Sequence, residues 1–268
     1  MSIESSASYI NAATTVINTK GAWSELLASS ALQSKAINVT IGFPSAALEC
    51  LTDIGTGAGG AEVVVISDIP QAGGTDWGIN CPNINIPLNI AASTRIACRT
   101  QVDIAGAQSV GVAILIISGS TTATTITYGA DTTNSDGSPI DCGAVVNTKG
   151  AYTEITASTS ATHDMLSPVI TGGQNTSPQY AIFFMDISTG AGGAETVVIP
   201  DIGFISNTAS DVFNPVNWAL PLDITSGTRI AARAKCGTTD ATDRVFDLVI
   251  IASSNSQFVA GGTHSFVS

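Results

Sequence analysis

The sequence predicts an all-β protein: two homologous β-sandwich domains in tandem, jelly-roll-like, produced by an internal duplication. Short runs rich in Val, Ile and Thr recur at intervals of about 8–12 residues between Gly, Asn, Asp and Pro, a rhythm typical of sandwiches and barrels. Several motifs repeat about 130 residues apart, which is the length of a whole domain. Charged residues make up only 11% of the 268-residue chain, so charged helical or coiled-coil architectures are excluded.

The first repeated block is Asn-Thr-Lys-Gly-Ala, at residues 18–22 and again at 147–151. Leucine spacing over 24–35, just after the first copy, fits a helix. The matching segment 153–165 is rich in Thr and Ser and fits a helix poorly. Because homologous copies share their elements, we predict strand plus loop in both segments.

The second block, residues 53–62, joins Asp-Ile to a glycine-rich run and recurs at 186–195. Its first copy fits the letters of the dinucleotide-binding pattern G-x-G-x-x-G. Such a site requires a helix directly after the motif, whereas the β-branched run 63–66 follows here. We therefore predict a glycine-rich hairpin turn, with Ser188 replacing the first glycine in the second copy.

The third block, Thr-Arg-Ile-Ala-x-Arg, holds four of the five arginines of the chain. Residues four apart in a strand point to the same face, so the two arginines of each copy share a face. Acidic residues repeat with them, and guanidinium pairs well with carboxylate. We predict structural ion pairs or, alternatively, a subunit contact; binding of an anionic ligand is a third reading. The residues concerned are Arg95, Arg99, Arg229, Arg233, Glu62 and Glu195.

The longest apolar run, 110–117, is β-branched, ends at Ser and Gly, and predicts a buried strand; it is too short for a membrane-spanning helix, which needs about 20 residues. Repeats and composition place the first domain at 1–120 and the second at 144–268. The segment 121–143 is rich in Thr, Ser, Asp and Gly, and we predict a linker there.

Charge and cysteine content narrow the function classes. Nine basic residues against 21 acidic give a net charge of −12, which disfavours nucleic acid as a partner. The five cysteines do not align between the copies, so we expect buried thiols, with no disulfide framework, metal site or cofactor. His163 is not duplicated, and we expect it at the surface. The sequence shows no nucleophile-elbow motif and no other catalytic constellation, so we expect no enzymatic activity; a hydrolase is a third reading.

The two copies differ most over residues 70–86 and 203–219. These segments hold Trp77, Phe213 and Trp218, and aromatic residues on loops often form contact surfaces. They are candidates for binding a partner protein or a glycan. The alternative is that the rings fold back and cap their own sandwich.

The ordered set of Asp-Ile-Gly-x-Gly-x-x-Gly-x-Glu, Ile-Pro-Leu and Thr-Arg-Ile-Ala-x-Arg resembles a β-rich module of virion proteins from tailed bacteriophages. The resemblance covers about residues 18–117 and 147–251. It implies a non-enzymatic accessory protein on the capsid (decoration or cement) or on the tail (fibre or tip), acting through contacts with other virion proteins.

Further expectations accompany this resemblance. The N-terminus carries no export signal, so we expect synthesis in the host cytoplasm and final location in the virion. Three copies of a two-domain chain would present six similar domains, which favours a homo-oligomer, a trimer or hexamer. The alternative function is a carbohydrate- or receptor-binding module that contacts a host glycan through the aromatic loops.

Overall fold

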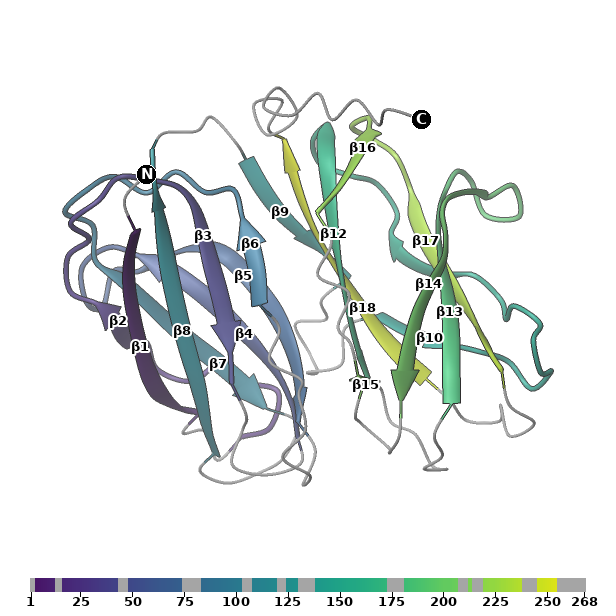
Figure 1. Cartoon of the computed structure of the whole chain (residues 1–268), viewed down its shortest axis with the longest axis horizontal. Coiled ribbons are helices and arrows are strands. Elements are labelled where there is room, and N and C mark those ends of the chain that lie inside the picture. Colours follow the sequence, from purple (N-terminus) through teal and green to yellow (C-terminus); the bar gives the residue numbers. More distant parts are fainter. Residues whose placement is uncertain are drawn as a thin grey trace, which may run out of the picture.

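The computed structural model describes residues 3–12, 16–42, 48–73, 83–102, 108–119, 124–129, 138–172, 181–206, 212–213, 219–237 and 245–254. Regular structure in these ranges is entirely β-strand, arranged as four antiparallel sheets in two sandwiches (Figure 1). The predicted all-β fold with two sandwich domains is confirmed. In the described ranges there is no helix capable of crossing a membrane.

The first domain contains eight strands in two four-stranded sheets. One sheet has the order β1-β8-β3-β6 and the other β2-β7-β4-β5, which is the strand order of a jelly roll. The strands are β1 (Ile3–Ala12), β2 (Ser24–Leu27), β3 (Ser34–Ile41), β4 (Leu48–Thr56), β5 (Val63–Gly73), β6 (Asn83–Ile86), β7 (Ile96–Val102) and β8 (Gln108–Ser118).

The second domain repeats this order as β10-β18-β12-β16 and β11-β17-β13-β14, with a short strand β15 added beside β14. Both segments predicted as strand plus loop have that structure, as β2 and β3 in the first copy and β11 and β12 in the second. The strands are β9 (Thr124–Tyr128), β10 (Ser138–Asp141), β11 (Thr153–Thr156), β12 (His163–Gly172), β13 (Ala181–Thr189), β14 (Thr196–Ser206), β15 (Val212–Phe213), β16 (Leu220–Ile224), β17 (Ile230–Cys236) and β18 (Val245–Ser254).

The segment 121–143 is not a linker in its described residues, which corrects the predicted boundary. Both β9 and β10 pair with β18, β9 along Ile250–Ser254 and β10 along Val245–Leu248. Together they occupy the place that the single long strand β1 occupies against β8. The composition was misleading because Thr is β-branched and suits a strand as well as a loop. The second domain therefore begins at β9.

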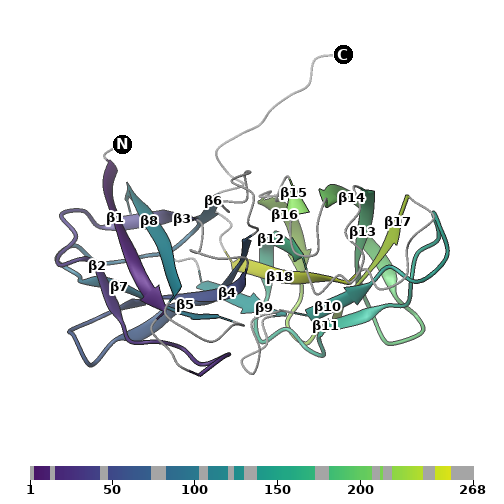
Figure 2. The ribbon, with the colours of Figure 1, turned by 90° about the horizontal axis from the view of Figure 1, so that it is seen from below.

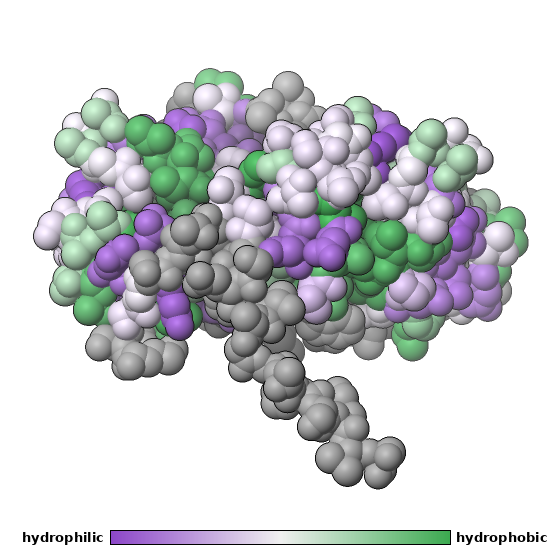
Figure 3. Space-filling view, turned by 90° about the horizontal axis from the view of Figure 1, so that it is seen from above, coloured by the Kyte–Doolittle hydropathy of each residue, from purple (hydrophilic) through white to green (hydrophobic). Residues whose placement is uncertain are grey.

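Alternating apolar side chains fill the space between the sheets of each sandwich. The core of the first domain consists mainly of Ile, Val and Leu side chains. The second core is built around three phenylalanines, Phe183, Phe204 and Phe246, whose ring centroids are 4.4–5.5 Å apart. At the surface, hydrophobic residues gather in patches among hydrophilic ones over both domains (Figure 3).

The two sandwiches lie side by side and share an apolar contact (Figure 2). Strand β5 of the first domain lies against β9 and β12 of the second. Val169 on β12 and Ile251 on β18 are buried in the same apolar cluster as the first core. The Thr125 hydroxyl also donates a 2.7 Å hydrogen bond to the Pro87 carbonyl oxygen. The domains thus form one packed unit.

Candidate functional site

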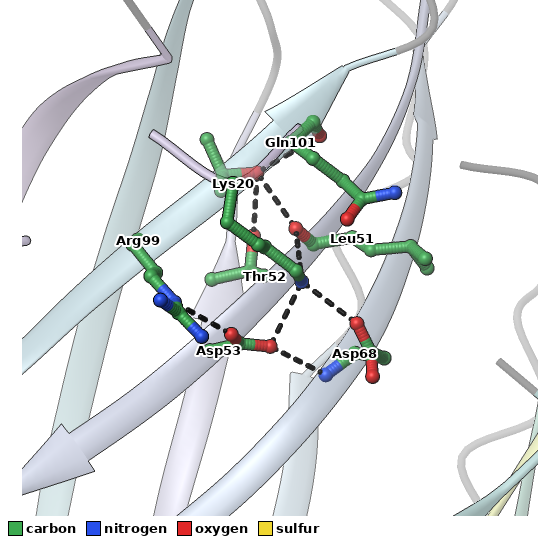
Figure 4. Close-up of polar contacts among 8 residues, drawn as sticks. Lys20, Leu51, Thr52, Asp53, Asp68, Arg99 and Gln101 are labelled. Atoms are coloured by element: carbon green, nitrogen blue, oxygen red, sulfur yellow. Dashed lines mark hydrogen bonds and ion pairs between the residues drawn. The ribbon is translucent and has the colours of Figure 1, made fainter. Parts of the chain in front are cut away.

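The main charged cluster of the first domain lies on the β2-β7-β4-β5 sheet and is centred on Asp53 (Figure 4). Oδ1 of Asp53 is 2.8 Å from Nζ of Lys20, and its Oδ2 is 2.8 Å from Nε of Arg99. Lys20 also lies 2.7 Å from Oδ1 of Asp68 and donates to the Leu51 carbonyl oxygen at 3.1 Å. The Asp53 side chain is only 3% exposed, so a partly buried carboxylate is held between two cations.

Local backbone geometry explains why this cluster forms. Asp53 on β4 is directly opposite Arg99 on β7, so the two side chains are cross-strand neighbours. Asp68 has a φ of 53° beside an irregularity in the β4–β5 register, and its backbone N–H donates to Oδ1 of Asp53 at 2.9 Å. Asn18 also has a positive φ, of 55°, a conformation that Asn tolerates better than most residues. The motif 18–22 therefore places Lys20 over the sheet.

The second domain reproduces this cluster around Asp186. Lys149 lies 2.7 Å from Asp186 and 3.0 Å from Asp201, and Nε of Arg233 lies 3.1 Å from Asp186. The Asp201 N–H donates to Oδ1 of Asp186 at 3.0 Å. A further cation, Lys235, is 3.6 Å from Asp201. The same geometry thus occurs twice in one chain.

A second cluster fixes the glycine-rich turn between β4 and β5. Arg95 pairs with Glu25 through Nε and with Glu62 through a terminal nitrogen, both at 2.8 Å. The terminal nitrogen also donates to the Gly57 carbonyl oxygen at 3.2 Å, and Glu62 accepts the Gly60 N–H at 2.9 Å. The predicted hairpin is confirmed, and its arginine connects β2, the turn and the start of β7.

The matching turn between β13 and β14 has the same contacts. Nε of Arg229 lies 2.7 Å from Glu154, and its terminal nitrogen lies 3.1 Å from Glu195 and from the Gly190 carbonyl oxygen. Glu195 accepts the Gly193 N–H at 3.0 Å. All six charged residues singled out in the sequence are therefore placed in ion pairs within their own domains. The subunit contact remains a prediction.

In each domain an aromatic ring lies over the second arginine of the repeated motif. The two rings differ in size, and the residue beneath them differs to match. The Arg99 guanidinium lies 4.7 Å from the centroid of Trp23, and that of Arg233 lies 4.6 Å from Tyr152. A Cβ atom on Gly55 would lie 2.5 Å from the Trp23 ring, so the larger ring requires glycine. In the second copy Ser188 stands at this position, and its hydroxyl donates to the shorter Tyr152 at 3.2 Å. The change from Gly55 to Ser188 between the two copies is thus matched by the change from Trp23 to Tyr152.

The surroundings of Asp186, the central carboxylate of the second domain's cluster, keep it ionised. Burial alone would raise the pKa of Asp186, but hydrogen bonds from Lys149, the Asp201 backbone and Arg233 outweigh it and lower that pKa. The pKa of Asp201 is also lowered, mainly by its bond to Lys149. The hydrogen bonds that Arg229 donates to Glu154 and Glu195 raise the pKa of Arg229. Such groups serve as fixed charges and are poor proton donors.

The lysines are the members of the site that sequence reasoning missed. Lys20 and Lys149 belong to the duplicated motif of the first block, and the duplication was the signal that could have revealed their role. Seven of the nine basic residues of the chain take part in ion pairs within the described ranges: Lys20, Arg95, Arg99, Lys149, Arg229, Arg233 and Lys235. Most of the basic residues therefore hold neighbouring segments of their own domain together.

The aromatic loop candidates are not placed by the structure. Trp77 and Trp218 lie outside the described residues. The backbone of Phe213 is described in β15, paired with Ile205, but its side chain is not. Binding of a glycan through these residues remains a prediction.

The expected surface position of His163 is wrong. Its side chain is fully buried, and Nε2 lies 2.8 Å from the Tyr128 hydroxyl on β9. Burial lowers the pKa of His163, while the nearby Asp164 carboxylate raises it less. The sequence could not show this, because the ring is covered by a strand from the segment taken for a linker.

The described cysteines match the expected buried thiols. Cys50, Cys98, Cys142 and Cys236 are buried and carry thiols, and burial raises the pKa of Cys98 to about 12. Cys81 lies outside the described residues. Over the part of the chain described here, no group of three or more His, Cys, Asp or Glu side chains is arranged to hold a metal ion.

Comparisons with known proteins give a likeness of fold. No protein-family model and no curated protein matches the chain. Among solved structures, it is similar to peptide-N(4)-(N-acetyl-β-D-glucosaminyl)asparagine amidase, with 11% identity, a TM-score of 0.36, and coverage of 93% of this chain and 97% of that one. PNGase F from Flavobacterium meningosepticum gives 10% identity, a TM-score of 0.36, and 93% and 96% coverage.

A viral particle protein shows a weaker likeness. The structure of T=1 particles derived from infectious bursal virus matches with 12% identity and a TM-score of 0.31, covering 95% of this chain and 70% of that chain. At such identities the likeness concerns the β-sandwich fold alone. The chain is an all-β tandem of two jelly-roll sandwiches.

Proposed function

We propose that the chain is a non-enzymatic structural protein of a tailed-phage virion, an accessory on the capsid or the tail that acts through protein–protein contacts. The observation that carries the proposal is that most lysine and arginine side chains are held in ion pairs inside the chain. Seven of nine basic residues form ion pairs within their own domain, and six of them repeat the same arrangement in both domains. A scaffold benefits from such fastening, because it must keep its shape inside an assembly.

The protonation states of the paired residues also favour a structural role. General acid–base catalysis needs a carboxyl group whose pKa lies near the working pH. Asp186, Glu195 and Asp201 have their pKa values lowered instead, by bonds to basic side chains and backbone N–H groups. These carboxylates stay charged and bound to their partners.

Net charge and the motif resemblance support the virion location. A chain with a net charge of −12 is repelled by packaged DNA and suits the outside of a particle. The three ordered motifs that resemble phage virion modules include the turn glycines and the paired arginines of both domains. The residues that carry the resemblance therefore have a structural use here.

The test is binding to particles. Phage particles made without this protein are mixed with the purified chain and sedimented, and bound protein is quantified per particle. We expect saturable binding with a fixed copy number. Failure to bind particles, together with binding to host cells or polysaccharide, would overturn the proposal.

A second arm separates the glycan-binding alternative. The double variant Trp77→Ala and Trp218→Ala is assayed for both particle and polysaccharide binding. We expect particle binding to survive. Loss of polysaccharide binding in this variant, with no binding to particles by either protein, would favour the carbohydrate-binding function.

A further inference from the structure

The two domains of one chain contact each other through different surfaces. The first contributes β5 and the segment after β6, and the second contributes β9, β12 and β18. By strand order, the counterpart of β5 is β14, and the counterparts of β9, β12 and β18 are β1, β3 and β8. Within the described residues, no element takes part together with its own counterpart, so the contact is heterologous and not two-fold symmetric. Each chain therefore keeps one further copy of each surface.

Burial along the last strand of each domain shows one of these remaining surfaces. Strand β18 is buried on both faces: Val249 and Ile251 lie outside the core cluster of their own domain, and Ile251 is buried in the cluster of the first domain. At the equivalent positions of β8, Leu115 and Ile117 are half-buried, while Ile114 and Ile116, which face the core, are buried. The outer face of β8 is thus open among the described residues.

The side chains on this open face resemble an interface. The outward row of β8 reads Gly111, Ala113, Leu115 and Ile117, with no polar side chain. A sheet face turned to water ordinarily carries polar residues in alternation with the core. An apolar row of this kind marks a contact surface. The β8 row has kept the apolar character of its counterpart on β18, whereas the neighbouring β3 row presents Asn38 and Thr40 on the same face.

The second remaining surface is strand β14. On β5, the strand that lies against the second domain, Asp68 and Pro70 are buried. Their counterparts on β14 are Asp201, which is exposed, and Gly203, which is half-buried. The Asp68 side chain is 11% exposed and that of Asp201 is 54% exposed. The β14 side is therefore more open to a partner than the β5 side.

We propose that a second copy of this chain docks its β14 side onto the outer β1-β8-β3 face of the first, repeating between chains the contact made within each chain. The result is head-to-tail association, which closes into a ring or continues as a filament according to the rotation at each contact. Three chains in a ring would place six sandwich domains around one axis. The inference deepens the proposed structural role, but it rests on the interdomain contact and not on a virion.

Two variants remove one surface each. Leu115→Arg puts a charge on the open face of β8. Gly203→Arg puts the same charge on β14, where an added Cβ would meet Phe184 at an ordinary 3.7 Å, so the single chain accepts it. Gly192→Arg is the matched control, because nothing lies within 4 Å of a Cβ at that turn position. Light scattering measures the mass of each protein, without particles, from 1 to about 200 μM.

We expect wild type and Gly192→Arg to form assemblies of several chains and both surface variants to remain monomeric. A mixture of Leu115→Arg and Gly203→Arg should form dimers and stop there, because one intact β14 side still meets one intact β8 face. A monomeric wild type, or surface variants that assemble like wild type, would overturn the inference. A mixture that stays monomeric would overturn it too. Particle binding by a monomeric protein would leave the virion role intact, so the two proposals fail separately.

Discussion

At the scale of single residues, the protein is held together by carboxylates that each accept from several donors. Asp186 is 6% exposed in its side chain and lies between Lys149 and Arg233. Two cations and a backbone N–H share one carboxylate, so removing its charge leaves Arg233 without a carboxylate partner among the described residues and Lys149 with only the exposed Asp201. For stability, the burial of this carboxylate matters more than the number of ion pairs, because exposed pairs contribute little.

Asp186→Asn should therefore lower the free energy of unfolding by about 3 kcal/mol, the lower range for breaking a buried pair. Asp201→Asn is the control in the same cluster: its side chain is 54% exposed, and we expect a loss of less than about 1 kcal/mol. Urea unfolding at pH 7 measures both. Equal losses for the two variants would show that burial does not set the strength of the cluster.

The exchange of Gly55 and Trp23 for Ser188 and Tyr152 predicts a coupled pair of substitutions. Gly55→Ser places a Cβ 2.5 Å from the Trp23 ring and should destabilise the chain by about 1–3 kcal/mol, as overpacking does. Adding Trp23→Tyr should recover most of that loss, because the second domain holds this combination. A double-mutant cycle in urea measures the coupling, and additive effects would contradict a shared cause.

His163 predicts a dependence of stability on pH. Its folded pKa is lowered by burial, whereas an unfolded histidine titrates near pH 6.5. Between those values only the unfolded chain binds the proton, so stability falls as the pH drops below about 6.5. His163→Gln keeps a polar partner for Tyr128 but cannot titrate, and it should flatten the curve. Urea unfolding at pH 7.5 and 5.5 measures this, and identical slopes for the two proteins would refute it.

At the scale of elements, the β4–β5 and β13–β14 hairpins each depend on a glycine that no other residue replaces easily. Gly57 and Gly190 have φ of 117° and 109°, and a Cβ on either would lie 2.9 Å from a backbone oxygen. Arg95 and Arg229 bind the carbonyl oxygens of these same glycines. Turn geometry and ion pairing therefore depend on one another.

Gly190→Ala should cost about 1–3 kcal/mol through backbone strain and the close contact. Gly192→Ala, two residues away with an open surrounding, should change stability by less than about 0.5 kcal/mol. Thermal unfolding of the two variants provides the comparison. A similar shift of the unfolding temperature in both variants would mean that general loop flexibility, and not the φ of Gly190, sets the contribution of the turn to stability.

At the scale of the whole molecule, the domains are coupled by a small apolar contact. Val169 is 3% exposed and buried with the first core, and its counterpart Asn38 is half-buried on the open face. Val169→Asn should leave an amide short of partners at the contact, at a cost of about 1–3 kcal/mol, and should separate the unfolding of the two domains. Calorimetry should then show two transitions. Asn38→Val is the reverse change on the open face and should leave the transition pattern unaltered; a Val169→Asn protein that melts like wild type would contradict the coupling.

The fold class, the duplication and the paired arginines with their repeated glutamates could all be predicted from the sequence. Alternating apolar runs, turn glycines and motifs repeated at one spacing are local signals, so they can be read along the chain. The same-face placement of Arg95 and Arg99 followed from the period of a strand. These features depend on neighbours in sequence or on a simple period.

Tertiary structure alone decided which partners those residues meet. Lys20 pairs with Asp53, which lies 33 residues further along the chain. Tyr128 covers His163 from β9, a strand in the segment whose composition predicted a linker. Burial of β18 on both faces, against one face of β8, arises only when two similar domains pack through unlike surfaces. Long-range pairing is chosen by the summed packing of whole sheets, and no short stretch of sequence contains that sum.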